Sequence, residues 1–281
     1  MIRFMSEDVW AIGDAYEFYM GRWSRRVAVE FVSWLGVAPG SDWLDVGCGT
    51  GALTAVILDR ADPAETVGID TSERFVQRAR DLLSDPRASL GVGDATALAF
   101  PDDRFDAAVS GLMLNFVPEA ATAAAELVRV TRPSGTTAAF VWDYADGMTM
   151  LRHLWDAATE LDPAASSMDE GVRFPMCQPD ALQRLWDNAG LVDVAVDEIT
   201  VVTRFDDFDD YWTPFLGGQG PAPGYVMSRS EHQRTALRDL LHRQLPVESD
   251  GSITLTARAW AVKGSPRDDR TADRGPRLSP R

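Results

Sequence analysis

The chain has 281 residues, 45% of them hydrophobic, which is enough to bury a sizeable core. Its formal net charge of −16 lacks the positive footprint that a phosphate backbone requires, so we do not expect a nucleic-acid partner. Cys48 and Cys177 are too few for a disulfide framework. No apolar run reaches the roughly 18 residues of a membrane helix. The start carries Glu7 and Asp8 without an apolar stretch, so we expect a cytoplasmic protein.

The first predicted element is an amphipathic helix over residues 15–34. Its aromatic and aliphatic residues recur at helical spacing, and its charged residues fall elsewhere on the wheel. Because only a short turn separates this helix from the next element, its first turns can fold back over that element. We expect residues 1–40 to form a helical lid; the alternative is that the aromatic stripe only fills the core. The side chains expected to face a site are Tyr16, Tyr19, Met20 and Trp23.

A buried strand, three alternate glycines and a helix start come next. They read Trp43-Leu44-Asp45-Val46-Gly47-Cys48-Gly49-Thr50-Gly51-Ala52. Glycines let the backbone turn sharply and approach a ligand closely. The helix N-terminus adds free N–H groups and the positive end of its dipole. This glycine turn therefore predicts a site for a ligand that carries a nucleoside or a carboxylate.

Two further predicted strands end in carboxylates. Asp70 lies 19 residues after Gly51, where a carboxylate can accept hydrogen bonds from both hydroxyls of a ribose. The alternative is that Asp70 belongs to the start of the helix after Thr71. Asp94 can accept from an exocyclic amine, with Ala95 packing beside the ring, although a lone aspartate is usually a loop residue.

A fourth strand over 104–110, a turn over 132–135 and a fifth strand over 137–142 complete the first half. The fifth strand ends at Asp143 and Tyr144. Strands that alternate with helices at this spacing predict a parallel, doubly wound sheet. Ligands in such sheets bind beyond the carboxyl ends of the strands. The residues that fall on that edge are Asp45, Asp70, Asp94, Ser110 and Asp143.

The second half is less regular. Composition predicts a loop over 217–224, and the segment 264–281 is rich in Arg, Asp, Pro and Gly, so we expect a disordered tail. The predicted helices cover 149–161, 179–189, 206–215 and 230–244, and the predicted strands cover 192–203 and 253–262.

The glycine turn, Val67-Gly68-Ile69-Asp70, Gly93-Asp94-Ala95 and residues 129–135 together resemble class I S-adenosylmethionine-dependent methyltransferases. Within that family the resemblance is to the branch of ubiquinone and menaquinone C-methyltransferases, and it covers about residues 43–142. It implies that the donor's methionine part lies against the glycine turn, its ribose on Asp70 and its adenine beside Asp94. The cofactor-binding residues expected on this basis are Asp45, Gly47, Gly49, Thr50, Gly51, Asp70, Thr71, Asp94, Ala95 and Ser110.

The resemblance also implies a seven-stranded, Rossmann-like α/β sheet of order 3-2-1-4-5-7-6 with strand 7 antiparallel. The two late strands would supply its last two positions. We therefore expect a donor-binding core over 41–145, and acceptor-side helices and closing strands of the same domain over 146–263.

Methyl transfer to a small-molecule acceptor needs the nucleophile, the methyl carbon and the sulfur in line, so proximity can suffice without a side-chain nucleophile. A base helps some acceptors; the candidates for acceptor contact or for a base are Asp143, Tyr144 and His153. Quinone enzymes of the family carry an Arg-Asn pair after the fourth strand, where this chain has Leu114-Asn115. Asn115 stays a candidate for acceptor contact, whereas the change at Leu114 argues against a quinone. No metal is expected, and the oligomeric state stays open.

Two other functions remain alternatives. An NAD(P)-dependent oxidoreductase is compatible with the Gly47-x-Gly49-x-x-Ala52 spacing and with Asp70. Asp45 and Asp94 have no obvious use in such an enzyme, which favours methyl transfer. A protein that binds S-adenosylmethionine without turning it over would carry the same motifs.

Overall fold

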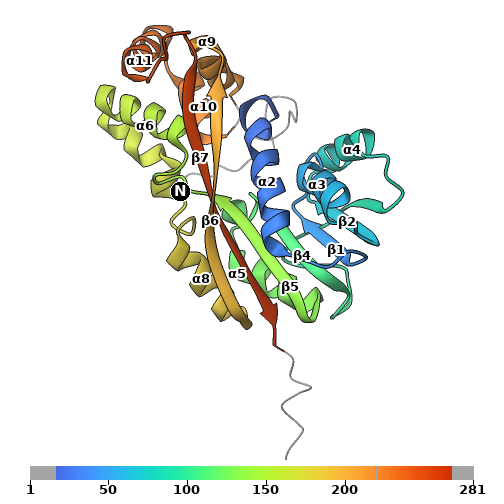
Figure 1. Ribbon diagram of the computed structural model, residues 1–281. Coiled ribbons are helices and arrows are strands. Elements are labelled where there is room, and N and C mark those ends of the chain that lie inside the picture. The colour runs from blue at the N-terminus through green and yellow to red at the C-terminus, as the bar shows by residue number, and fades with distance from the viewer. Residues whose placement is uncertain (1–16, 219, 268–281) are drawn as a thin grey trace, which may run out of the picture.

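The computed structural model describes residues 17–218 and 220–267; Tyr16 and residues 268–281 of the expected tail lie outside these ranges. Its sheet has the order β3-β2-β1-β4-β5-β7-β6 (Figure 1). Strands β1 to β5 run parallel, and β7 is antiparallel to both β5 and β6, which confirms the predicted fold. The strands are β1 (Asp42–Val46), β2 (Glu65–Asp70), β3 (Ala88–Val92), β4 (Phe105–Gly111), β5 (Thr131–Trp142), β6 (Leu191–Phe205) and β7 (Ile253–Pro266).

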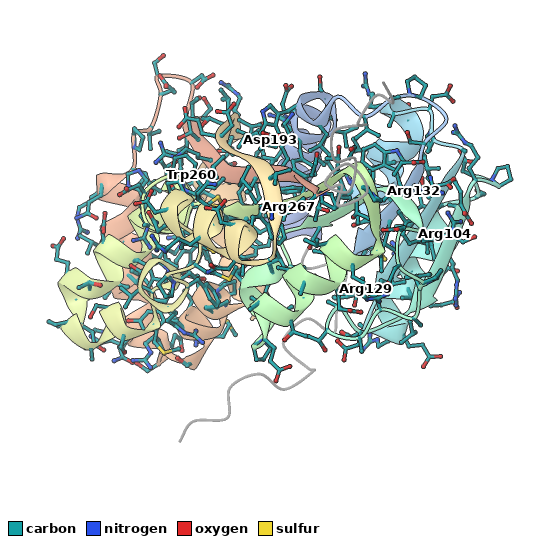
Figure 2. The ribbon with its side chains drawn as sticks, turned by 90° about the horizontal axis from the view of Figure 1, so that it is seen from below. Arg104, Arg129, Arg132, Asp193, Trp260 and Arg267 are labelled. Atoms are coloured by element: carbon teal, nitrogen blue, oxygen red, sulfur yellow. The ribbon has the colours of Figure 1, made fainter. Side chains whose placement is uncertain are left out.

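Helices cover both faces of the sheet (Figures 1 and 2). One face carries α2 (Arg22–Leu35), α3 (Ala52–Arg60) and α4 (Glu73–Leu82), and the other carries α5 (Ala120–Val130) and α8 (Pro179–Asn188). A π-helical turn, η2 (Glu17–Gly21), leads into α2. The apolar stripe of α2 faces the sheet, since Phe31 is fully buried with its ring centroid 4.8 Å from that of Phe140 on β5.

The remaining helices gather around the far halves of the long strands β6 and β7 (Figure 1). The predicted loop over 217–224 is wrong from Pro221 onward, because α10 begins there with proline at its first position. The predicted tail also begins too early, since β7 continues to Pro266. These elements are α6 (Thr149–Leu161), η4 (Pro163–Met168), α7 (Glu170–Arg173), α9 (Phe208–Trp212), η5 (Thr213–Gly217), α10 (Pro221–Ser228) and α11 (Glu231–Gln244), whereas the short η3 (Leu114–Phe116) lies in the connection between β4 and α5.

The predicted turn over 132–135 lies inside β5 as an irregularity. Thr131 pairs with Phe105 and Thr136 pairs with Ala107, so one intervening residue of β4 faces four of β5. Ser134 takes a positive φ of 61° there. The turn was therefore correctly predicted, but the strand resumes its pairing on both sides of it.

Arginines gather at the edge of the sheet opposite the carboxyl ends of β1, β2 and β4, where Figure 2 shows Arg104, Arg129 and Arg132. Arg104 bonds Asp42 at 2.9 Å, and Arg132 reaches the same carboxylate at 3.2 Å. Arg129 bonds Asp102 at 2.8 Å. These cations are thus engaged in ion pairs rather than presented as a free basic patch.

Within the described ranges, none of the helices has the length and apolar character that crossing a bilayer demands. The same residues hold no group of three or more His, Cys, Asp or Glu side chains that is placed to bind a metal ion. Cys48 and Cys177 are both buried and free.

Candidate functional site

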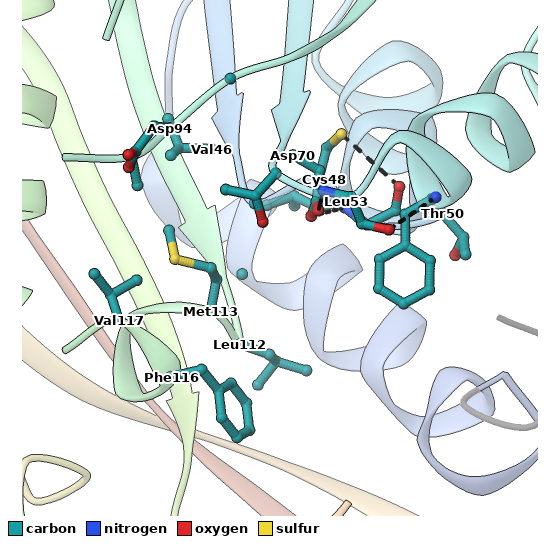
Figure 3. A pocket seen from close by; sticks show the side chains of 18 of the residues that line it. Val46, Cys48, Thr50, Leu53, Asp70, Asp94, Leu112, Met113, Phe116 and Val117 are labelled. Carbon is teal, nitrogen blue, oxygen red and sulfur yellow. Dashed lines mark hydrogen bonds between the residues drawn. The ribbon is translucent and has the colours of Figure 1, made fainter. Parts of the chain in front are cut away.

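A cavity of about 1010 Å³ lies at the carboxyl ends of β1, β2 and β4 (Figure 3). Its wall is built from five parts of the chain: one face of α2, the glycine turn after β1, the start of α4, the loop after β3, and the connection from β4 to α5. Phe140 of β5 completes the wall. The position agrees with the rule that ligands of open α/β sheets bind outside the strand ends.

The three glycines of the turn all take positive φ, namely 76° at Gly47, 54° at Gly49 and 87° at Gly51. A Cβ on Gly47 would lie 2.4 Å from Cγ of Met113, and one on Gly51 would lie 2.7 Å from Cδ1 of Leu83. A Cβ on Gly49 would meet no protein atom within 4 Å, and Gly49 lines the cavity. The outer two glycines are therefore required for packing, whereas the middle one leaves the backbone open to a ligand.

Asp45 lies buried beneath this turn, at 0% exposure. Its Oδ2 accepts a hydrogen bond of 2.7 Å from the Thr54 hydroxyl on α3, and its Oδ1 has no partner among the described residues. Burial raises the pKa of Asp45 to about 7. Asp45 does not line the cavity. The structure therefore does not place Asp45 in the predicted direct contact with the cavity. Asp45 is instead a buried carboxylate behind the glycine turn, and one of its oxygens has no hydrogen-bond partner among the described residues.

Asp70 joins the end of β2 to the glycine turn. Its Oδ2 accepts from the backbone N–H of Gly49 at 3.0 Å, and its Oδ1 accepts from the N–H of Ser72 at 2.8 Å. Burial raises the pKa of Asp70 above its usual range. Each carboxylate oxygen has two lone pairs, so both oxygens can still accept a further hydrogen bond from the cavity that Asp70 lines.

Asp94 lines the cavity from the loop after β3. Its Oδ1 accepts 2.8 Å hydrogen bonds from the backbone N–H and from the hydroxyl of Thr96. These bonds hold the pKa of Asp94 below its usual range, so the side chain is ionised at neutral pH. Ala95 is buried and lines the same wall.

Most of the predicted cofactor-binding residues meet at this cavity. Two exceptions besides Asp45 are Gly51, whose role is packing, and Ser110, which is fully buried. Successive side chains of a strand point to opposite faces, so Ser110 faces away and its neighbour Gly111 lines the cavity instead. The predicted residues that do line it are Gly47, Gly49, Thr50, Asp70, Thr71, Asp94 and Ala95.

The helix α2 lines the cavity with a different face from the one expected, and its role as a lid stays a prediction. Tyr19 and Trp23 pack edge-on against Phe215 and Phe205, with ring centroids 5.6 and 5.4 Å apart, and Met20 is buried at 4% exposure. None of these three lines the cavity. The residues of α2 that do are Ser24 and Ala28, which lie one helical turn apart.

The candidates for a base do not line the cavity either. Asp143 accepts from the N–H of Gly147 at 3.0 Å and from Nε of Arg258 at 2.8 Å, so its carboxylate ties the end of β5 to β7. Tyr144 is buried against Phe174, with ring centroids 5.5 Å apart. His153 is half-buried on α6, and burial lowers its pKa.

Asn115 is buried beside the cavity, next to Phe116, which lines it. Neither atom of its amide has a hydrogen-bond partner among the described residues. Such an amide is costly to bury and is available to a group that reaches it.

Sequence reasoning missed the apolar wall of the cavity. Most of it comes directly after β4, on the same edge of the sheet as the glycine turn, and Phe140 is added by the neighbouring strand β5; that position was the signal that could have revealed it. The residues concerned are Leu112, Met113, Phe116, Val117 and Phe140.

Comparison with known proteins agrees with this geometry. Residues 44–139 match the family model described as a methyltransferase domain. The 2-methyl-6-phytyl-1,4-hydroquinone methyltransferase of Synechocystis is 36% identical over 119 residues, which cover 42% of this chain and 37% of that protein. The demethylmenaquinone methyltransferase of Staphylococcus aureus is 36% identical over 115 residues, which cover 40% of this chain and 46% of that protein.

A solved structure of similar fold is phosphoethanolamine N-methyltransferase 2 of Haemonchus contortus, in complex with phosphomonomethylethanolamine and S-adenosylhomocysteine. It has a TM-score of 0.58 at 14% identity and covers 90% of this chain and 57% of that one. The chain spans about half, or less, of the length of the curated relatives it matches. The matched segment includes the glycine turn, Asp70 and Asp94, so residues 44–139 match a methyltransferase domain and resemble the corresponding part of these quinone methyltransferases.

Proposed function

We propose that the protein transfers the methyl group of S-adenosylmethionine to a small-molecule acceptor by in-line displacement. The observation that carries this proposal is the cavity of about 1010 Å³ that has both a polar wall and an apolar wall. Small-molecule sites occupy about 300–1000 Å³, so this cavity is large enough for a donor together with a small acceptor.

The residues present fit the donor. Gly49 exposes backbone in a place that a Cβ would occupy, and Asp45 keeps a buried acceptor oxygen behind the turn. Asp70 would accept from the ribose hydroxyls with the lone pairs that Gly49 and Ser72 leave unused. Asp94, ionised and beside Ala95, would accept from the adenine amine.

When bound, the donor supplies a methyl group on a positively charged sulfur, which is already a good leaving group. The chain's contribution is then orientation and exclusion of water. Asp70 holds the glycine turn through the N–H of Gly49 and would accept from the ribose, and Ser24 and Ala28 of α2 line another side of the cavity. Because none of the predicted base candidates lines the cavity, proximity and alignment account for most of the expected rate enhancement.

The acceptor is proposed from the relatives and the cavity together. The named relatives act on hydroquinones and demethylmenaquinone, so a hydroquinone ring is the first acceptor to test. The quinone enzymes of the family carry an arginine where this chain has Leu114. This difference argues that the acceptor of this protein differs from a quinone in the part that would lie near residue 114. The cytoplasmic location expected from the sequence stays a prediction.

Calorimetric titration with S-adenosylhomocysteine tests the donor assignment, with NADH as the competing ligand. We expect the first to bind and the second not to bind. Asp70→Asn should weaken S-adenosylhomocysteine binding by about tenfold or more, since hydrogen bonds to a charged acceptor contribute about 1.5–3 kcal/mol. Binding of NADH alone would favour the oxidoreductase instead.

Transfer of tritium from labelled S-adenosylmethionine into a hydroquinone or another small acceptor then separates an enzyme from a protein that only binds the donor. Donor binding without transfer to any acceptor of a broad panel would support the non-catalytic alternative.

A further inference from the structure

The cavity has two ends of different chemistry (Figure 3). One end, around the glycine turn and the ends of β2 and β3, presents hydroxyls, backbone N–H groups and the carboxylates of Asp70 and Asp94. The other end lies between α2 and the connection after β4. Among the described lining residues of α2, of β5 and of the connection from Gly111 to Glu119, the only ionisable one is Glu119, at the far end of the connection next to α5; it is a carboxylate, so this end holds no cation.

The hydroxyl on this second end is already engaged. Ser24 donates its hydroxyl hydrogen to the carbonyl of Gly21 at 3.1 Å, within its own helix. The neighbouring wall consists of Ala28, Leu112 and Phe140. Such a wall offers no counter-charge, and a charged group placed against it would lose hydration without compensation.

Phe116 gives this end an aromatic surface in a fixed position. Its ring packs edge-on against Phe174, with the centroids 5.3 Å apart and the planes at 78°. Figure 3 shows Phe116 and Leu112 side by side, away from Asp70 and Asp94. Aromatic pairs prefer edge-to-face or offset contacts, so a second ring can pack against the side of Phe116 that lines the cavity.

Ala28 limits the room at this end. It is 2% exposed and lines the cavity, while Val27 and Phe31 on the adjacent face of α2 are fully buried in the core. Because these core contacts fix the rotation of the helix, extra bulk at residue 28 would enter the cavity.

We propose that this apolar end is the acceptor compartment, that the acceptor part bound there is an uncharged apolar ring, and that Ala28 sets the size the compartment admits. This inference rests on the proposed function. It adds the substrate class and a specificity-determining residue on α2, outside the matched segment 44–139.

The test uses two probes that share one ring system, 2-naphthol and 2-naphthol-6-sulfonate, titrated calorimetrically into the full chain saturated with S-adenosylhomocysteine. We expect 2-naphthol to bind and the sulfonate to bind at least about tenfold more weakly, because its charge finds no partner at this end. Equal affinity for the two probes, or binding of neither, would overturn the inference.

Ala28→Leu should lower the affinity for 2-naphthol by about tenfold or more, while S-adenosylhomocysteine affinity changes by no more than about twofold. Ser33→Leu is the matched control, because it adds more bulk at an exposed position of the same helix and should change neither affinity. Phe116→Ala is a second variant, expected to weaken 2-naphthol binding by about fivefold through loss of the ring contact.

The outcomes separate this inference from the proposed function. Failure of the wild-type protein to bind S-adenosylhomocysteine would contradict the proposed function itself, and this inference with it. Normal S-adenosylhomocysteine binding together with unchanged 2-naphthol affinity in both Ala28→Leu and Phe116→Ala would contradict the acceptor compartment alone.

Discussion

Nζ of Lys263 on β7 donates a hydrogen bond of 2.7 Å to the carbonyl oxygen of Trp34, and it lies 4.4 Å from the centroid of the Trp34 ring. Trp34 belongs to the last turn of α2, where backbone carbonyls lack partners inside the helix and the dipole end is negative. One cation thus fixes the C-terminal end of a helix that lines the cavity.

Lys263→Met should therefore destabilise the protein by about 1–2 kcal/mol, through loss of a charged hydrogen bond at a helix end. Urea unfolding followed by circular dichroism measures this loss. Lys263→Arg keeps a donor and a charge and should recover at least half of it. Equal loss in both variants would contradict the capping role.

The glycines of the turn should respond differently to the same substitution. Gly47→Ala should lower the free energy of unfolding by about 3 kcal/mol or more, because a positive φ is combined with a contact of 2.4 Å to Met113. Gly49→Ala carries only the backbone cost of about 1–2 kcal/mol. S-adenosylhomocysteine affinity should fall most for Gly49→Ala, measured at a temperature where both variants are folded. A larger loss of stability in Gly49→Ala together with a larger loss of affinity in Gly47→Ala would contradict the assignment of Gly47 to packing and of Gly49 to ligand contact.

Asp143 is expected to matter for stability rather than for chemistry. Its carboxylate is 2% exposed and accepts from Arg258 and from Gly147. Asp143→Ala leaves the Arg258 guanidinium without this partner and should cost about 3–5 kcal/mol in urea unfolding. Donor affinity, measured while the variant is folded, should stay within about twofold. A normal unfolding midpoint together with lost methyl transfer would restore Asp143 as a catalytic candidate.

Glu170 gives the protein a pH-dependent stability. Its carboxyl group is 2% exposed and accepts from the indole N–H of Trp155 and from the N–H of Ala222 at 3.1 Å, at the start of α10. Burial raises the pKa of Glu170 from 4.5 to about 7. The folded state therefore binds the proton of Glu170 more tightly than the unfolded state does. The contribution of this proton to the free energy of unfolding is fully present below pH 4.5 and is lost as the pH rises through about 7.

In Glu170→Gln this pH dependence is absent. The free energy of unfolding of the wild type relative to the variant should therefore fall by about 3 kcal/mol between pH 4.5 and pH 8. Denaturant titrations at several pH values measure this difference, and Asp45 cancels because both proteins contain it. A constant difference across that range would show that the pKa of Glu170 is not raised.

The sheet and its glycine turn were predictable because local sequence determines them. The apolar strands are short and bounded, and only glycine adopts the positive φ of the turn without strain. The same local signals placed Asp70 and Asp94 at strand ends, and both line the cavity.

The side chains that point into the cavity were less predictable, because their orientation depends on packing between segments that are distant in the sequence. Ser110 and Gly111 are equivalent in a strand prediction, and only the position of α3 decides which of them faces the cavity. The aromatic residues Tyr19 of η2 and Trp23 of α2 pack against Phe215 and Phe205, which come from the second half of the chain. No pattern within the helix could show that Ser24 and Ala28 would line the cavity.

The helix α10 was also not predictable from its own sequence. Its sequence of Pro, Ala, Pro and Gly is typical of a loop. The carboxylate of Glu170 satisfies the N–H of Ala222 at its first turn, and Ala222 and Val226 are fully buried. Tertiary contacts therefore stabilise a helix that its own residues disfavour.

Lys263 is the only lysine in the sequence, so it carries the only side-chain amine of the protein. The acylation rate of this amine by an amine-selective reagent, followed by mass spectrometry of the peptide that contains it, reports on one contact between β7 and α2. A slower rate in the presence of S-adenosylhomocysteine would mean that the helix end is held more firmly when the cavity is filled. The unmodified protein thus has a built-in chemical probe for the movement of a helix that lines its cavity.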